Sequence, residues 1–93
     1  MPNIEIYGIM DSREQANILT KVFSTIKEHF PDNFEDTVAT IIDSEVYDFN
    51  MISKPYIRLS HEDSKLATNI GKTLSLATSL DVKVNLVASF TSK

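Results

Sequence analysis

The fold is decided by residues 3–43, which read NIEIYGIMDSREQANILTKVFSTIKEHFPDNFEDTVATIID. Residues 3–9 alternate apolar and polar side chains, which predicts a strand with one buried face. Residues 37–43 are rich in β-branched side chains and predict a second strand. A helical pattern separates the two, so we expect a βαβ unit, in which parallel strands are joined by a helix.

The helix of this unit has signals at both ends. Asp11 with Glu14 forms one candidate capping box at its start. Ser12 with Gln15 forms another. Pro31 is expected to end the helix. Between these points the apolar residues recur at helical spacing on one stripe: Leu19, Val22, Phe23, Ile26 and Phe30.

The second half of the chain repeats this order. Residues 55–60 alternate as a third strand, and Ser60 with Asp63 is expected to cap a second helix. Residues 82–90 alternate again and predict a fourth strand. The helix between them turns a second apolar stripe inward: Leu66, Ala67, Ile70, Leu74 and Ala77.

These elements predict a single α+β domain over residues 1–93, with halves 3–43 and 55–90 joined by a connection at 44–54. We expect a two-layer sandwich: a four-stranded mixed sheet with both helices on one face. Two fused βαβ units would pair the first strand with the second, whereas the alternative, a ferredoxin-like sheet, would make the first and third strands neighbours. Alternation assigns these residues to the uncovered face: Glu5, Tyr7, Tyr56, Arg58, Lys83, Asn85 and Val87.

Composition narrows the function classes. The net charge is −4 and the nine basic residues are scattered, which argues against nucleic acid or an anionic membrane as a partner. No apolar run is long enough to cross a membrane, and residues 1–30 lack a signal-peptide pattern, so we expect a cytoplasmic protein. A chain of 93 residues buries a small core, which favours self-association.

The same composition predicts no metal and no cofactor. The chain has no cysteine and only two histidines, without the spacing of a zinc-binding helix. Gly71-Lys72-Thr73 is not a phosphate-binding loop, because position 66 is leucine and the triplet lies inside a helix. Tyr7 and Tyr56 on neighbouring strands lack the basic signature of an RNA-binding sheet.

A cluster at His61, Glu62 and Asp63 allows two interpretations. Acidic and histidine side chains together are typical of catalytic sites. The first turn of a helix also favours acidic side chains through the helix dipole. We interpret this cluster as a helix cap.

Pro2 has the chemistry of a catalyst. If Met1 is removed, the chain begins with a secondary amine, and burial favours the neutral form of an amine, which can accept a proton. The alternative is structural, because proline is also tolerated at the first position of a strand.

Met1-Pro2 before an alternating strand, Glu14-Gln15 in the first turn of a helix, and the strand at 38–42 resemble the tautomerase superfamily, which includes oxalocrotonate tautomerase and macrophage migration inhibitory factor. The double βαβ order also looks like its fused members. The resemblance implies that Pro2, freed by methionine removal, moves a proton between carbons of a small enol or keto acid. It further implies a trimer with sites at the subunit boundaries.

The substrate-binding arginines of the oxalocrotonate type are replaced here. Asp11 stands three residues before the Glu-Gln pair, and Ala39 stands in the second strand. Arg58 and Arg13 are the cations that could hold an oxyanion from new positions. We therefore keep two hypotheses. The first is a keto-enol isomerase that uses Pro2 as general base, with Arg58 or Arg13 holding the oxyanion. The second is a non-catalytic ligand-binding or assembly module of ferredoxin-like or tautomerase-like fold.

Overall fold

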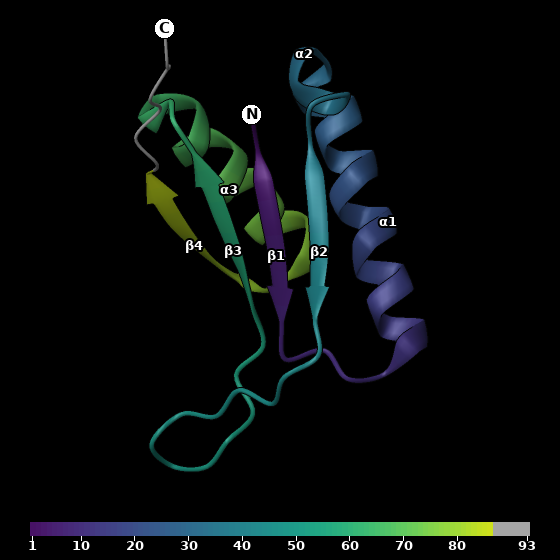
Figure 1. Cartoon of the computed structure of the whole chain (residues 1–93), viewed down its shortest axis with the longest axis vertical. Helices are drawn as coiled ribbons and strands as arrows, with labels where there is room; N and C mark the ends of the chain where they lie inside the picture. Colours follow the sequence, from purple (N-terminus) through teal and green to yellow (C-terminus); the bar gives the residue numbers. More distant parts are fainter. Residues whose placement is uncertain (87–93) are drawn as a thin grey trace, which may run out of the picture.

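A computed structural model describes residues 1–86 of the chain (Figure 1). The elements follow in the order β1 (Asn3–Tyr7), α1 (Ser12–His29), α2 (Pro31–Phe34), β2 (Val38–Ile42), β3 (Tyr56–His61), α3 (Ser64–Thr78) and β4 (Asp81–Leu86). Both predicted βαβ units are present. The predicted end of the last strand, residues 87–90, lies outside the described residues.

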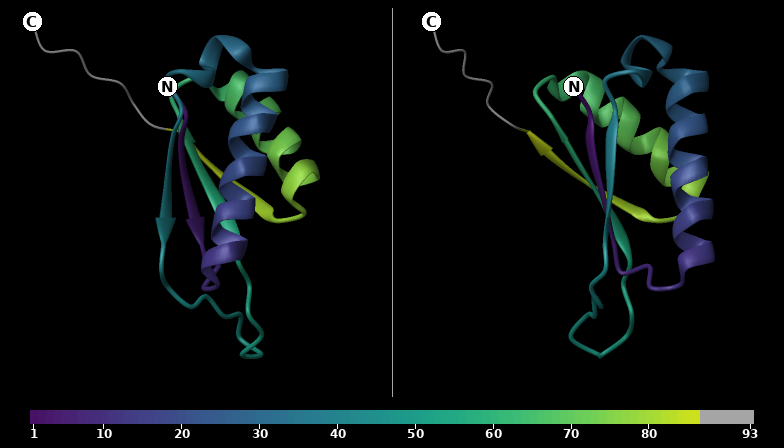
Figure 2. Two further views of the ribbon diagram at one scale, coloured as in Figure 1. Left: turned by 90° about the vertical axis from the view of Figure 1, so that its right-hand side faces the viewer. Right: turned by 45° about the vertical axis from the view of Figure 1, so that its right-hand side comes forward.

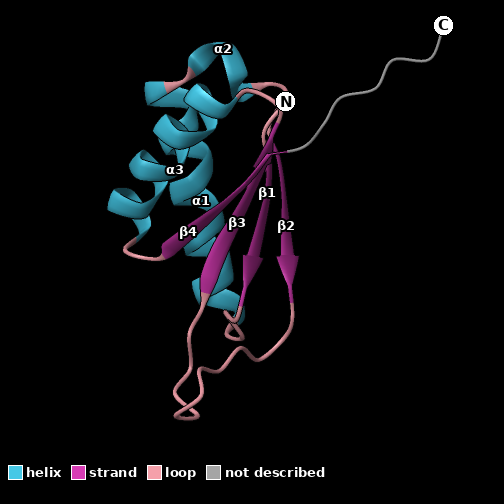
Figure 3. Cartoon of the chain, turned by 90° about the vertical axis from the view of Figure 1, so that its left-hand side faces the viewer, coloured by secondary structure: helices cyan, strands magenta, loops and turns pink. Residues whose placement is uncertain are grey.

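The four strands form one mixed sheet in the order β2-β1-β3-β4 (Figure 3). β1 pairs in parallel with β2, and β3 pairs in parallel with β4. The two units join through an antiparallel pairing of β1 with β3. Pairing of the first strand with the second is the arrangement of two fused βαβ units, and it rules out the ferredoxin-like alternative. Contact between the first and third strands occurs as well, so that contact alone does not distinguish the two folds.

Helices α1 and α3 cover one face of the sheet and enclose the core (Figure 2). Alternate side chains of β1 and β3 point into this layer because side chains in a strand alternate between faces. The core combines them with the inner stripes of both helices: Ile4, Ile6, Ile9, Val22, Ile26, Ile57, Leu59, Ile70 and Leu74. Ala77, which the sequence assigned to this layer, is exposed, and Thr78 is buried in its place.

Within residues 1–86 no helix covers the other side of the sheet, which we call the open face. The strand residues on this face are those that the sequence predicts. Glu5 pairs with Arg58 across β1 and β3, and Arg58 pairs with Lys83 across β3 and β4. Val87, also predicted there, lies outside the described residues. Tyr7 and Tyr56 stack with ring centroids 4.8 Å apart, and Lys83 Nζ lies 4.3 Å from the Tyr56 centroid.

The helix ends show which of the predicted capping and stop residues take that role in the structure. The Asp11 carboxylate accepts the Glu14 N–H (3.1 Å), so Asp11 caps α1. Helix α1 ends at His29, but Pro31 also begins the short helix α2, which the sequence analysis did not predict; proline suits the first turn of a helix. The second predicted cap was wrong: Ser60 belongs to β3, and the carboxylate of Asp63 alone caps α3 by accepting the Leu66 N–H (3.0 Å).

The connection between β2 and β3 projects beyond the sheet (Figure 1). Its turn is fixed by Asp48, whose Oδ1 accepts the backbone N–H groups of Asn50 (2.8 Å) and Ile52 (3.1 Å). Phe49 at its tip is 91% exposed. Among the described helices, none has the length and hydrophobicity needed to cross a bilayer.

Candidate functional site

The candidate site lies where β1 begins and β3 ends. A pocket of about 310 Å³ opens there, lined mainly by apolar surface. Its lining comes from the chain start, β1, β2 and the end of β3: Met1, Asn3, Val38, Ser60, His61 and Glu62. Residues far apart in the sequence meet at this point because β1 pairs with β2 on one side and with β3 on the other.

Pro2 is fully buried, and its two neighbours in the chain, Met1 and Asn3, line this pocket. Its carbonyl oxygen accepts the N–H of Val38 (3.1 Å), which fixes the start of the chain against β2. Asn3 pairs with Ser60, so the register continued by one residue puts Pro2 opposite His61. Pro2 also shares the strand phase of Ile4, so its ring lies on the helix-covered side of the sheet.

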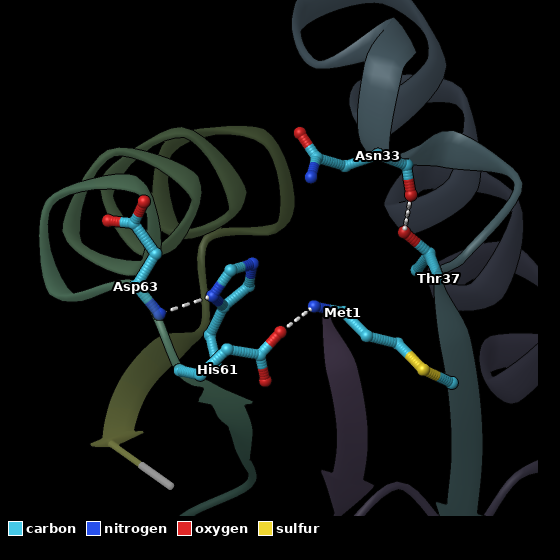
Figure 4. A network of polar contacts seen from close by, with 6 residues as sticks. Met1, Asn33, Thr37, His61 and Asp63 are labelled. Atoms are coloured by element: carbon cyan, nitrogen blue, oxygen red, sulfur yellow. Dashed lines mark hydrogen bonds and ion pairs between the residues drawn. The ribbon is translucent and has the colours of Figure 1, made fainter. Parts of the chain in front are cut away.

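Met1 covers this end of the sheet and is 59% exposed. Its terminal ammonium forms an ion pair with the Glu62 carboxylate (Figure 4). The hydrogen bond from this ammonium lowers the pKa of Glu62 below its ordinary value. While Met1 is present, the Pro2 nitrogen is an amide and has no basicity.

His61 is a buried polar residue that the continued strand register places opposite Pro2. It is 3% exposed, and its Nδ1 accepts the backbone N–H of Asp63 (2.8 Å; Figure 4). Its Nε2 is buried and finds no hydrogen-bond partner within residues 1–86. The sequence analysis assigned His61 to a helix cap, but His61 ends β3 and only Asp63 provides the cap side chain. The available signal was strand phase, because His61 continues the alternation of Ile57 and Leu59 into the core.

The two arginines named from the sequence lie elsewhere on this chain. Arg58 sits in the middle of the open face, opposite Glu5, and its Nε lies 4.0 Å from Glu5 Oε1. Arg13 is exposed in the first turn of α1, which follows the other end of β1. A single chain therefore brings Pro2 together with His61 and Glu62, and separates it from Arg58 and Arg13.

The site holds residue types that can donate and accept protons or hydrogen bonds. Within residues 1–86, no three His, Asp or Glu side chains are arranged to hold a metal ion. The pocket instead combines an apolar wall, a buried imidazole, a carboxylate and the chain start. Removal of Met1 would turn the Pro2 nitrogen, which follows one lining residue and precedes another, into a secondary amine, a group that can take up and return a proton.

Comparison with protein-family models finds no matching family, and comparison with curated protein sequences finds no match. Solved structures do match. Macrophage migration inhibitory factor of Toxoplasma gondii superposes with a TM-score of 0.62 at 10% identity, covering 95% of this chain and 88% of that chain. For the MIF2 protein of Leishmania major the TM-score is 0.56 at 12% identity, with coverages of 96% and 89%.

A third match is a fused 4-OT described as a symmetric trimer, with a TM-score of 0.56 at 7% identity over 92% of this chain and 84% of that chain. At such identities the likeness concerns the fold. The chain has the fold of the tautomerase superfamily, as the sequence resemblance predicted.

Proposed function

We propose that this protein is a tautomerase-like keto-enol isomerase in which Pro2, freed by removal of Met1, is the general base. The observation that carries the proposal is the burial of Pro2 between Met1 and Asn3, two residues that line an apolar pocket at the start of β1. The shared fold with macrophage migration inhibitory factors and a fused 4-OT supports it. The proposed substrate is a small enol or keto acid, and the proposed reaction needs no cofactor.

In this reaction the neutral amine of Pro2 takes the proton of the enol hydroxyl and delivers a proton to the adjacent carbon of the C=C bond. The carbon–carbon double bond becomes single as the C=O bond of the ketone forms, and Pro2 returns to its neutral form. The burial of Pro2 supports this role, because an amine away from water favours its uncharged form. The developing oxyanion needs a hydrogen-bond donor or a cation. Arg58 and Arg13 can act at the Pro2 nitrogen only from a neighbouring copy of the chain, so their proposed role goes with self-association.

The proposal is tested with the enol of phenylpyruvate. Intact mass first establishes whether Met1 is absent from the protein made in its natural host. Enol-to-keto conversion is then followed by ultraviolet absorbance for the wild type, Pro2→Ala and a matched control, Pro31→Ala. We expect Pro2→Ala to lower kcat/KM by about 100-fold or more, the scale of a lost general base, and Pro31→Ala to leave it unchanged. Retained Met1, or equal rates for wild type and Pro2→Ala, would contradict the proposal.

A second candidate is a non-catalytic ligand-binding or assembly module. The open face favours it, because within residues 1–86 no helix covers this side of the sheet. The replacement of the expected arginines by Asp11 and Ala39 also favours it. Such a module would self-associate like the isomerase but would not convert phenylpyruvate, so the same assay separates the two candidates.

A further inference from the structure

His61 is a buried hydrogen-bond donor without an acceptor. Its Nδ1 accepts the Asp63 N–H, so this nitrogen carries no proton. In the neutral ring the proton therefore sits on Nε2, which becomes a donor. Nε2 is buried and has no partner within residues 1–86. A buried donor left without an acceptor lowers stability, so its presence here calls for an explanation.

The position of this donor suggests what it binds. His61 lines the pocket together with Met1 and Glu62, and the strand register puts it opposite Pro2. The bond to Asp63 at the start of α3 fixes the ring, and Figure 4 shows Nε2 on the side turned away from this bond. Met1 lines the same pocket, and its terminal amine pairs with Glu62, the residue that follows His61 (Figure 4). Loss of Met1 removes both its side chain and its amine from this position.

We infer that His61, through its Nε2–H, is the anion-binding residue of the pocket and holds the carboxylate or the enolate oxygen of a small 2-oxo acid next to the Pro2 nitrogen. The inference rests on the proposed function for its choice of ligand class. A fixed N–H donor in a site shielded from water binds an anionic oxygen more strongly than a neutral one. His61 then supplies within one chain a donor that neither Arg58 nor Arg13 can bring to Pro2.

The test uses benzoylformate, a 2-oxo acid that cannot enolise because it has no hydrogen on the carbon next to the ketone. Binding is therefore measured without turnover, on the full chain lacking Met1 as verified by intact mass. The carbon-bound ring protons of both histidines are followed by nuclear magnetic resonance, because they do not exchange with water. Because the chain has only two histidines, exposed His29 serves as an internal reference. We expect benzoylformate to shift the His61 signal and to leave the His29 signal in place.

Two substitutions separate the two nitrogens of the ring. His61→Asn keeps an acceptor near the Nδ1 position for the Asp63 N–H but removes the Nε2 donor. His61→Gln keeps a donor near the Nε2 position but removes the acceptor. We expect His61→Asn to weaken benzoylformate binding by about tenfold or more, the scale of a lost hydrogen bond to a charged group, and His61→Gln by about threefold or less.

A purely structural His61 predicts the opposite pattern, with His61→Gln less stable and benzoylformate binding equal in both variants. Absence of benzoylformate binding, an unshifted His61 signal, or wild-type affinity in His61→Asn would each overturn the inference. If neither variant folds, the shift of the wild-type signal decides. Failure of the proposed function gives a different result. If benzoylformate binds in a His61-dependent way but phenylpyruvate is not converted, the anion-binding role of His61 is supported and the isomerase proposal is contradicted.

Discussion

Glu62 is the charged residue in direct contact with the amino terminus, and this contact makes stability depend on pH. The Met1 ammonium lowers the pKa of Glu62 in the folded protein from its ordinary value of 4.5. A carboxyl group with a lowered folded pKa contributes stability above its unfolded pKa and loses it as pH falls through the folded value. For protein that retains Met1, we expect Glu62→Gln to lower Tm at pH 7, and the difference to vanish well below pH 4.5.

The control for this measurement is Glu35→Gln. Glu35 is exposed and forms no ion pair within residues 1–86. Its substitution should leave Tm nearly unchanged at both pH values. A pH-independent difference for Glu62→Gln would show that the terminal ion pair makes no contribution to stability.

Gly8 is a residue whose backbone excludes a side chain. Its φ is +84°, and an added Cβ would lie 2.9 Å from Pro55 Cα, a backbone atom that cannot move aside. We expect Gly8→Ala to lower the free energy of unfolding by at least about 1–2 kcal/mol, measured by urea denaturation, because positive φ is costly for residues with a Cβ.

Gly71→Ala is the matched comparison. Gly71 lies within helix α3, and the one tight contact of an added Cβ would be with a side-chain atom, Val84 Cγ2, at 3.0 Å; the side chains of Val82 (3.6 Å) and Leu59 (3.9 Å) would lie at ordinary contact distance. Val84 is 42% exposed on edge strand β4 and can shift. The gain in helix propensity, about 1 kcal/mol, should roughly offset the close contact. A Gly8→Ala protein as stable as Gly71→Ala would contradict this account of the β1–α1 turn.

At the scale of elements, the start of helix α3 depends on one side chain. The Asp63 carboxylate accepts the Leu66 N–H, whereas Ser60 lies in β3 and makes no side-chain hydrogen bond within residues 1–86. We expect Asp63→Ala to lower the free energy of unfolding by about 1 kcal/mol, the usual worth of a helix cap. Ser60→Ala should cost less than about 0.5 kcal/mol. The free energies of unfolding are measured by urea denaturation. Equal decreases for the two variants would show that Ser60 is part of the cap.

This cap also shows which features of the structure local sequence patterns can predict. The strands and the two long helices were predictable because alternation and helical stripes are local. The prediction for Ser60 was wrong because β3 continues through His61. His61 pairs with Leu86 of β4, and a local sequence pattern does not contain that pairing. Pro2 was proposed from the chemistry of a free terminal amine and from the family resemblance, and its role stays a prediction. The pocket beside it depends on the pairing of Asn3 with Ser60, so only the folded chain brings His61 to Pro2.

For the whole molecule, the remaining question is what meets the open face. Val38 lies on this face, opposite Asn3, at the rim of the pocket, and is 45% exposed. Leu76 is a larger exposed apolar residue, at 86%, and lies on helix α3. If copies associate through the open face, a charge at Val38 is buried in the contact and a charge at Leu76 stays in water.

We therefore expect light scattering to give the wild type about three times the monomer mass of 10.5 kDa. Val38→Glu should reduce this to the monomer mass, and Leu76→Glu should leave it unchanged. Circular dichroism checks that both variants are folded. A monomeric wild type would contradict self-association, and dissociation by Leu76→Glu alone would move the contact to the helical side. Arg58 and Arg13 can reach the Pro2 nitrogen only from another copy, so a monomeric protein would also leave His61 as the candidate anion donor at this site.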